Sequence, residues 1–166
     1  MFCRQTAHSH KVRIPTLRLY SAFGPFEEPG RLLPTLVLHG LKGRLPALAD
    51  PNVARDFVYV DDVAEAYLLA AQRQTSDLGA VYNVGTGVQT TLRELVAAAK
   101  EVMNLVAEPV WNTMANRAWD ANVWVSDNRK IRAELGWQPR HSVADGIRLM
   151  REWFARGVLP VYEKSG

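Results

Sequence analysis

Cysteine is nearly absent from the 166-residue sequence, which contains Cys3 alone. A single cysteine cannot form a disulfide within the chain, and it cannot supply the ligand set of a cysteine-based zinc site. Residues 1–20 lack the apolar core of a signal peptide, and no run approaches the ~18 apolar residues of a membrane helix. We therefore predict a soluble, cytoplasmic protein.

Basic residues are not concentrated in any segment. The formal net charge is +3 and the pI is near 9.2, but no run of five or more basic residues occurs. Such a mildly basic balance suits a polyanionic ligand and is too weak to argue for nucleic acid. Nucleic-acid binding stays open only as an alternative based on the pI, and a flat salt dependence of DNA retention would dismiss it.

Several sequence motifs that mark catalytic or binding sites are missing. There is no H-E-x-x-H metal motif, no G-x-S-x-G nucleophile turn and no complete G-x-x-x-x-G-K phosphate loop. His8 and His10 are two positions apart, so a helix would place them on different faces. Gly85-Thr86-Gly87 lacks the third glycine of a dinucleotide fingerprint, and no acidic residue ends a strand ~20 residues later. We predict no metal site and interpret the glycine pair as a structural turn.

A tyrosine–lysine proton-transfer pair is also missing. Such a pair needs Lys four residues after Tyr, because the ammonium group lowers the pKa of the phenol. The positions four residues after the five tyrosines are occupied by Gly24, Val63, Ala71, Thr86 and Gly166. The sequence therefore contains no candidate catalytic residue of this kind.

Apolar periodicity predicts alternating strands and helices, which favours an α/β architecture, and the length predicts one unit. Expected strands cover residues 12–20, 57–60, 80–84 and 123–125, with a turn at 21–25. Expected helices cover residues 1–10, 31–39, 91–104 and 127–135, with two more beginning at 61 or 62 and at 142. Thr91 and Glu94 form a capping-box pattern, Asp61 or Asp62 and Asp127 are expected N-caps, and Gly136 is expected to end its helix in a left-handed conformation.

Two arginines make the best case for ligand binding. Arg55 precedes a predicted strand, and Arg117 lies in a loop rich in Trp and Asn. Forked guanidinium groups match the oxygens of a diphosphate, and two of them on rigid flanks can hold it from both sides. Either arginine alone would equally suit a solvated surface position.

Four segments in order resemble the NAD-dependent epimerase/dehydratase family, the extended short-chain dehydrogenases that modify nucleotide sugars. They are Arg18-Leu19-Tyr20-Ser21-Ala22-Phe23-Gly24-Pro25, Arg55-Asp56-Phe57 to Val63, Tyr82-Asn83-Val84-Gly85 to Leu95, and Arg117 to Leu135-Gly136-Trp137. Many family members have Asn where Ser21 stands. The resemblance covers nearly the whole chain.

The resemblance implies the C-terminal half of that fold: the last Rossmann strands and helices plus the small substrate-binding domain. Residues 1–166 are then one truncated unit, and the NAD-binding half with its Tyr-x-x-x-Lys pair is expected upstream of Met1. It also implies that Ser21, Arg55, Arg117 and Asp120 contact a nucleotide-diphosphate sugar, and that Leu19 and Tyr20 border NAD.

Two functions follow from this resemblance. The first is the substrate-binding portion of a nucleotide-sugar epimerase or dehydratase, an isomerase or lyase, inactive by itself. The second is a non-catalytic nucleotide-sugar-binding or regulatory module that kept the fold without the chemistry. Strand edges left open predict self-association or association with the N-terminal half.

Overall fold

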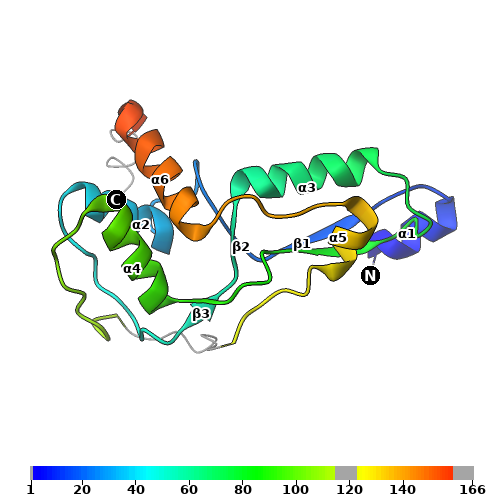
Figure 1. The fold of residues 1–166 in the computed structure, drawn as a ribbon. Coiled ribbons are helices and arrows are strands. Elements are labelled where there is room, and N and C mark those ends of the chain that lie inside the picture. The colour runs from blue at the N-terminus through cyan, green and yellow to red at the C-terminus, as the bar shows by residue number, and fades with distance from the viewer. Residues whose placement is uncertain (1, 115–122, 159–166) are drawn as a thin grey trace.

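The computed structural model describes residues 2–114 and 123–158 (Figure 1). Its elements are α1 (Phe2–His10), β1 (Thr16–Leu19), β2 (Ser21–Phe23), α2 (Leu32–Leu41), β3 (Ala54–Arg55), β4 (Phe57–Tyr59), α3 (Val60–Gln72), β5 (Val81–Val84), β6 (Thr90–Thr91), α4 (Leu92–Met103), α5 (Arg129–Leu135), α6 (Val143–Trp153) and the π-helical turn η1 (Phe154–Val158). Within these ranges, no helix is both long and apolar enough to cross a bilayer.

The described strands form three pairs. β1 lies parallel to β5 with Thr16 opposite Val81, and β2 lies parallel to β4 with Ser21 opposite Phe57. β3 and β6 form a short antiparallel pair, in which Arg55 is opposite Thr90. Parallel pairs joined through helices are the α/β arrangement that the sequence predicts.

Two separate hydrophobic cores divide the molecule. Figure 1 shows α2, α4 and α6 gathered at one end and α1, α3 and α5 beside the β1–β5 pair at the other. The first core packs those three helices on side chains of β2 and β4, including Phe23 and Tyr59. The second packs α3 against β5 and α5, with Trp137 fully buried. The β2–β4 pair therefore joins the two ends.

Two local capping signals in the sequence are confirmed, the Thr91–Glu94 box and Gly136. Thr91 Oγ1 accepts a hydrogen bond from the Glu94 backbone, and Glu94 returns the contact, so the capping box of α4 is complete. Ser142 and Asp145 form a second capping box at the start of α6. Gly136 ends α5 with φ +71°, a left-handed conformation that costs glycine nothing.

The first expected strand is shorter than predicted, and the turn after it is wrong in part. β1 starts at Thr16 because Pro15 has no N–H for the ladder, although the backbone N–H groups of Ile14 and Thr16 still bond to Leu78 and Ala80. Ser21–Phe23 is a strand rather than a turn, since it finds a parallel partner in β4. The chain turns only from Gly24 onward.

The strand expected at residues 123–125 is also wrong. Its backbone donors go to side chains instead of a neighbouring strand: Trp124 N–H donates to Gln89 Oε1 at 3.1 Å, and Ser126 N–H donates to Asp56 Oδ2 at 2.9 Å. These acceptors lie 35 and 70 positions away in the sequence, so the alternation of Val and Trp could not reveal them.

The expected aspartate N-caps are wrong as well. Helix α3 begins at Val60 behind Tyr59, without a side-chain cap, and Asp62 uses its carboxylate elsewhere. Helix α5 begins behind Asn128, again without a side-chain cap. Asp127 instead accepts from the backbone and guanidinium of Arg129 at 3.1 and 2.9 Å.

Candidate functional site

A buried aspartate organises the centre of the molecule. Asp56, fully buried between β3 and β4, accepts hydrogen bonds from Thr86 N–H and Oγ1, both at 2.7 Å, and from Gly87 N–H at 3.0 Å. A Cβ on Gly85 would lie 2.8 Å from Asp56 Oδ2, so this approach requires glycine. Since the turn's N–H groups bind a carboxylate of the same chain, the contacts agree with its interpretation as a structural turn.

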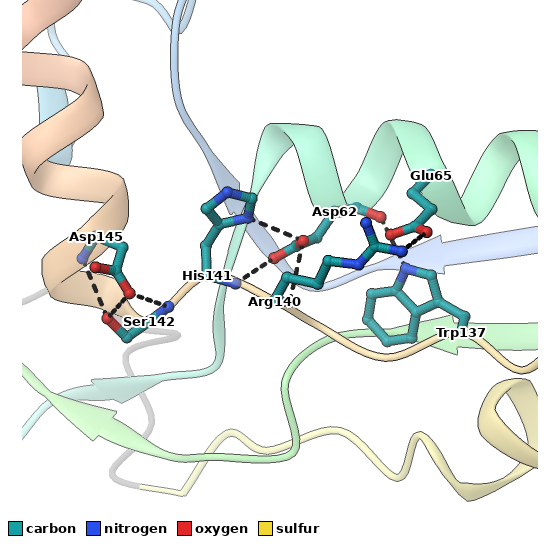
Figure 2. Close-up of polar contacts among 7 residues, drawn as sticks. All are labelled: Asp62, Glu65, Trp137, Arg140, His141, Ser142 and Asp145. Atoms are coloured by element: carbon teal, nitrogen blue, oxygen red, sulfur yellow. Dashed lines mark hydrogen bonds and ion pairs between the residues drawn. The ribbon is translucent and has the colours of Figure 1, made fainter.

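A second buried aspartate fixes the segment that leads into α6 (Figure 2). The Asp62 carboxylate accepts from the backbone N–H groups of Arg140 and His141, each at 3.1 Å, and its Oδ1 lies 3.0 Å from His141 Nδ1. The Asp62 carbonyl accepts from Trp137 Nε1 at 2.8 Å. Arg140 also pairs with Glu65 on α3. This cluster joins α3 to the chain between α5 and α6.

The Tyr59 phenol lies next to this cluster. Its ring is buried and 4.9 Å from the imidazole of His141. Burial raises the pKa of Tyr59 to about 12, with further contributions from the negative charges of Asp61 and Asp62. A phenol with such a raised pKa is a poor proton acceptor near neutral pH. The surroundings of Tyr59 are therefore those of a structural residue.

A pocket of about 440 Å³ opens beside β2, β3 and β4. Its apolar lining includes Phe23, Leu33, Leu48, Phe57 and Leu92, and all five are buried residues of the first core. Its polar lining comes from two strands and one loop: Ser21 lies on β2, Arg55 on β3, and Glu27 and Arg31 lie before α2. An apolar cavity with a few convergent polar groups is the usual form of a small-molecule site.

Arg55 is held at the pocket by an aromatic neighbour. Its guanidinium carbon lies 5.4 Å from the ring centroid of Trp124, and Nη1 donates to the Ala54 carbonyl at 2.7 Å. Trp124 in turn lies 6.3 Å from the Tyr20 ring in an edge-on arrangement. A guanidinium is attracted to an aromatic face, so this contact helps to orient Arg55 at the pocket.

Glu27 lines the pocket from the loop between β2 and α2. Burial raises the pKa of this carboxyl from 4.5 to about 7, although the positive charge of Arg31 and a backbone hydrogen bond at Gly24 oppose the rise. Arg31 Nε is 3.6 Å from Glu27 Oε1 and is mostly exposed. The pocket therefore contains an acid that is close to half-ionised near neutral pH.

The sequence-predicted residues have different outcomes. Ser21 and Arg55 line the same pocket. Tyr20 does not line it, but its ring contacts that of Trp124, which does. Leu19 ends β1 with 42% of its surface exposed. Arg117 and Asp120 lie outside the described residues, so their proximity to Arg55 stays a prediction.

Two pocket residues were missed by sequence reasoning. Trp124 was expected in a strand and Glu27 in a loop, and neither was expected at a site. No local signal marked Trp124, because its contacts with Gln89 and Arg55 join segments that are distant in the sequence. No local signal marked Glu27, because its burial depends on how the loop folds back over α2.

A family model establishes the relationship. The model of the NAD dependent epimerase/dehydratase family matches residues 1–85, just over half of the 166 residues. The chain belongs to this family. The resemblance inferred from the sequence motifs is thereby confirmed.

Individual relatives agree with this assignment. The UDP-glucose 4-epimerase of Mycolicibacterium smegmatis is 33% identical over 138 residues, which are 81% of this chain and 43% of that enzyme. The solved UDP-glucose 4-epimerase of Thermotoga maritima with UDP-glucose matches with a TM-score of 0.83 at 29% identity, over 95% of this chain and 51% of that one. The Bordetella bronchiseptica enzyme WbmF in complex with NAD+ and UDP matches with a TM-score of 0.79 at 28% identity, over 99% and 51%.

The comparisons confirm the predicted fold class. The chain spans about half the length of these solved structures and less than half of the M. smegmatis enzyme. The structure therefore corresponds to a partial, C-terminal region of a Rossmann-like α/β enzyme.

NAD is the cofactor of the family, and WbmF contains it in its solved complex. The residues of this chain fit it only in part. Leu19 ends β1 and Tyr20 follows it, and these are the two residues that the resemblance assigns to the border of NAD. The N–H groups of Thr86 and Gly87, in the glycine turn between β5 and β6, are occupied by Asp56, and the sequence has no other glycine-rich phosphate loop. We therefore derive no step of a reaction through NAD from these residues.

Proposed function

We propose that this chain is the substrate-binding portion of an NAD-dependent nucleotide-sugar epimerase or dehydratase, and that the pocket beside β2 and β3 binds the nucleotide-diphosphate sugar. The observation that carries the proposal is the placement of Ser21 and Arg55 in one pocket of about 440 Å³. That volume lies within the range of small-molecule sites. A nucleotide sugar needs both an apolar surface for its rings and a cation for its phosphates, and the lining offers both.

Each residue has a defined role in the proposal. Arg55 donates to the diphosphate oxygens, with Trp124 holding the guanidinium in place. Ser21 donates its hydroxyl to a sugar or phosphate oxygen. Arg117 and Asp120 approach the same diphosphate and its sugar from the loop that contains them. Leu19 and Tyr20 border NAD.

The chemistry of the parent reaction would be oxidation at a sugar carbon, followed by epimerisation or elimination. No tyrosine in this sequence is followed by lysine at the fourth position, so no residue pair of the chain can exchange the proton of that oxidation. We propose that residues 1–166 are inactive by themselves. Measurable turnover of UDP-glucose with NAD by the purified chain would contradict this.

A second candidate is a non-catalytic module that binds nucleotide sugars in the cytoplasm. Both candidates predict binding and differ in whether an NAD-binding half completes an enzyme. Among the described residues, β1 pairs with β5 alone and leaves one edge available. Self-association, or association with an NAD-binding half, would cover that edge. A clean monomer with a sharp thermal transition would argue against either form of association.

Calorimetric titration with UDP and UDP-glucose tests the binding proposal. Arg55→Ala should weaken UDP binding at least tenfold, because a charge-assisted hydrogen bond contributes about 1.5–3 kcal/mol. Arg93→Ala is the matched control: Arg93 also stacks on a tryptophan, at 5.5 Å from the Trp111 ring, but does not line the pocket. Equal affinities in the parent protein and the Arg55 variant would refute the proposed role.

A further inference from the structure

One buried oxygen in the pocket wall lacks a partner. Glu27 Oε2 is shielded from solvent and has no hydrogen-bond partner among the described residues, and it is the one side-chain atom within residues 2–114 and 123–158 in that condition. The other oxygen, Oε1, is 3.6 Å from Arg31 Nε, a distance too long for a good hydrogen bond. The side chain as a whole keeps 16% of its surface exposed and is part of the pocket lining.

Buried carboxyl oxygens are normally paired, because an unpaired one loses its bonds to water without replacement. The loop does not leave Glu27 free to swing into water. The Glu27 N–H donates to the Gly24 carbonyl, and the Arg31 N–H donates to the Glu28 carbonyl in the following turn. Thr35 Oγ1 donates to the Pro29 carbonyl at 2.9 Å. The carboxyl is therefore held in place with one acceptor unused.

The backbone beside Glu27 is strained as well. Phe26 has φ +68°, a left-handed conformation that is unfavourable for a residue with a Cβ, and its ring is fixed 5.1 Å from that of Trp153. Strained residues next to unpaired polar groups are typical of ligand-contacting loops. A position that served packing alone would do better with an apolar side chain.

We propose that the Glu27 carboxyl is a recognition group of the pocket, which accepts a hydrogen bond from an uncharged donor of the bound ligand, a hydroxyl or a ring N–H. The proposal rests on the proposed function, because the donors in question are those of a nucleotide sugar. The ribose, the pyrimidine ring and the hexose are three possible sources of such a donor.

The charges in the pocket decide which part of the ligand Glu27 can meet. A carboxylate repels the diphosphate, whereas Arg55 attracts it. Arg31, which also lines the pocket, offsets part of the Glu27 charge at the loop end. We therefore expect the phosphates at the β3 end, near Arg55, and a neutral, donor-bearing part of the ligand at the loop. This orientation separates recognition of the nucleotide sugar from simple anion binding.

Affinity measurements on Glu27→Leu and Glu27→Gln test the inference. Leu removes both acceptors and should weaken UDP-glucose binding about tenfold, the usual loss for one hydrogen bond to a charged group. Gln keeps one acceptor and should restore most of the affinity. Binding of inorganic pyrophosphate should be unchanged or tighter in both variants. Glu28→Leu, an exposed neighbour on the same loop that does not line the pocket, should behave like the parent protein.

Three probes identify the source of the donor. If Glu27 binds a ribose hydroxyl, the parent should bind 2′,3′-dideoxy-UDP more weakly than UDP. If it binds the ring N–H, N3-methyl-UDP should bind more weakly than UDP. If it binds a hexose hydroxyl, UDP should bind more weakly than UDP-glucose. Glu27→Leu should abolish whichever preference the parent shows. The thermal midpoints of the variants should equal or exceed that of the parent, since a buried acid is removed.

The two proposals fail in different ways. If the parent binds neither UDP, UDP-glucose nor pyrophosphate, the proposed function is wrong and this inference falls with it. If the parent binds them and Glu27→Leu changes no nucleotide affinity, only the role of Glu27 is wrong. An equal loss of pyrophosphate and nucleotide binding would also overturn it, because Glu27 would then act through the shape of the pocket.

Discussion

Removing the charge of Glu27 should stabilise the protein in a pH-dependent way. The carboxyl has a pKa of about 7 in the folded chain and 4.5 as its ordinary value, because burial disfavours the ionised form. The folded state therefore binds more protons than the unfolded state between these two pH values, and stability falls as the pH rises through that window. Glu27→Gln has no such proton to lose.

The magnitude follows from the two pKa values. At about 1.4 kcal/mol for each pH unit, the difference between 4.5 and about 7 corresponds to a loss of about 3 kcal/mol once Glu27 is fully ionised. At pH 5 the loss is under about 1 kcal/mol, because few folded molecules are ionised. The loop can relax toward water and toward Arg31 in the charged state, so the measured loss at pH 8 should fall between about 1 and 3 kcal/mol.

Urea unfolding followed by tryptophan fluorescence at pH 5, 6, 7 and 8 measures this difference. The free energy of unfolding of Glu27→Gln should exceed that of the parent increasingly from pH 5 to pH 8. The Glu28→Gln variant should follow the parent at each pH, since Glu28 is exposed. Parallel pH profiles for the parent and Glu27→Gln would refute the reasoning, because they would mean that the carboxyl is not desolvated.

Two further substitutions test the packing and the buried charges. Asp62→Ala should lower the free energy of unfolding by about 3 kcal/mol, since it leaves buried backbone donors without an acceptor, whereas exposed Asp61→Ala should cost well under 1 kcal/mol in the same urea titration. Equal effects would show that the Asp62 contacts add nothing. Gly146→Ala should cost about 1–3 kcal/mol, because its Cβ would lie 2.4 Å from the Phe23 ring, while Gly30→Ala, with nothing within 4 Å, should be neutral or slightly stabilising by calorimetry. A stable Gly146→Ala protein would mean that the ring can move aside.

The parts of the fold that could be predicted from the sequence are those set by neighbours along the chain. The capping box of α4 needs only Thr91 and Glu94, three positions apart, and both bonds are present. Gly136 could be placed because a left-handed helix end demands glycine whatever packs around it. Apolar periodicity gave the α/β class, and the family motifs added the assignment of Ser21 and Arg55 to one substrate, which no periodicity would have given.

The parts that could not be predicted depend on contacts across long stretches of sequence. Asp62 looked like an N-cap because it precedes an apolar helical pattern, but its acceptors are used by backbone groups 78 and 79 residues later. Trp124 looked like a strand residue because Val flanks it on both sides, but Gln89 takes its N–H. In each case a distant side chain replaced the local partner that the pattern assumed.

Two acids of the Arg55 to Val63 signature have a structural task. Asp56 is saturated by donors from the glycine turn and from Ser126, and Asp62 is saturated by donors from the chain before α6. Neither residue is among those that line the pocket. The signature thus has two roles. Its buried carboxylates hold backbone segments that are distant in the sequence, and the position of one of these segments places Trp124 against Arg55. A loss of Asp56 should therefore weaken ligand binding indirectly, through a displaced Trp124, whereas a loss of Arg55 should weaken it with the fold intact.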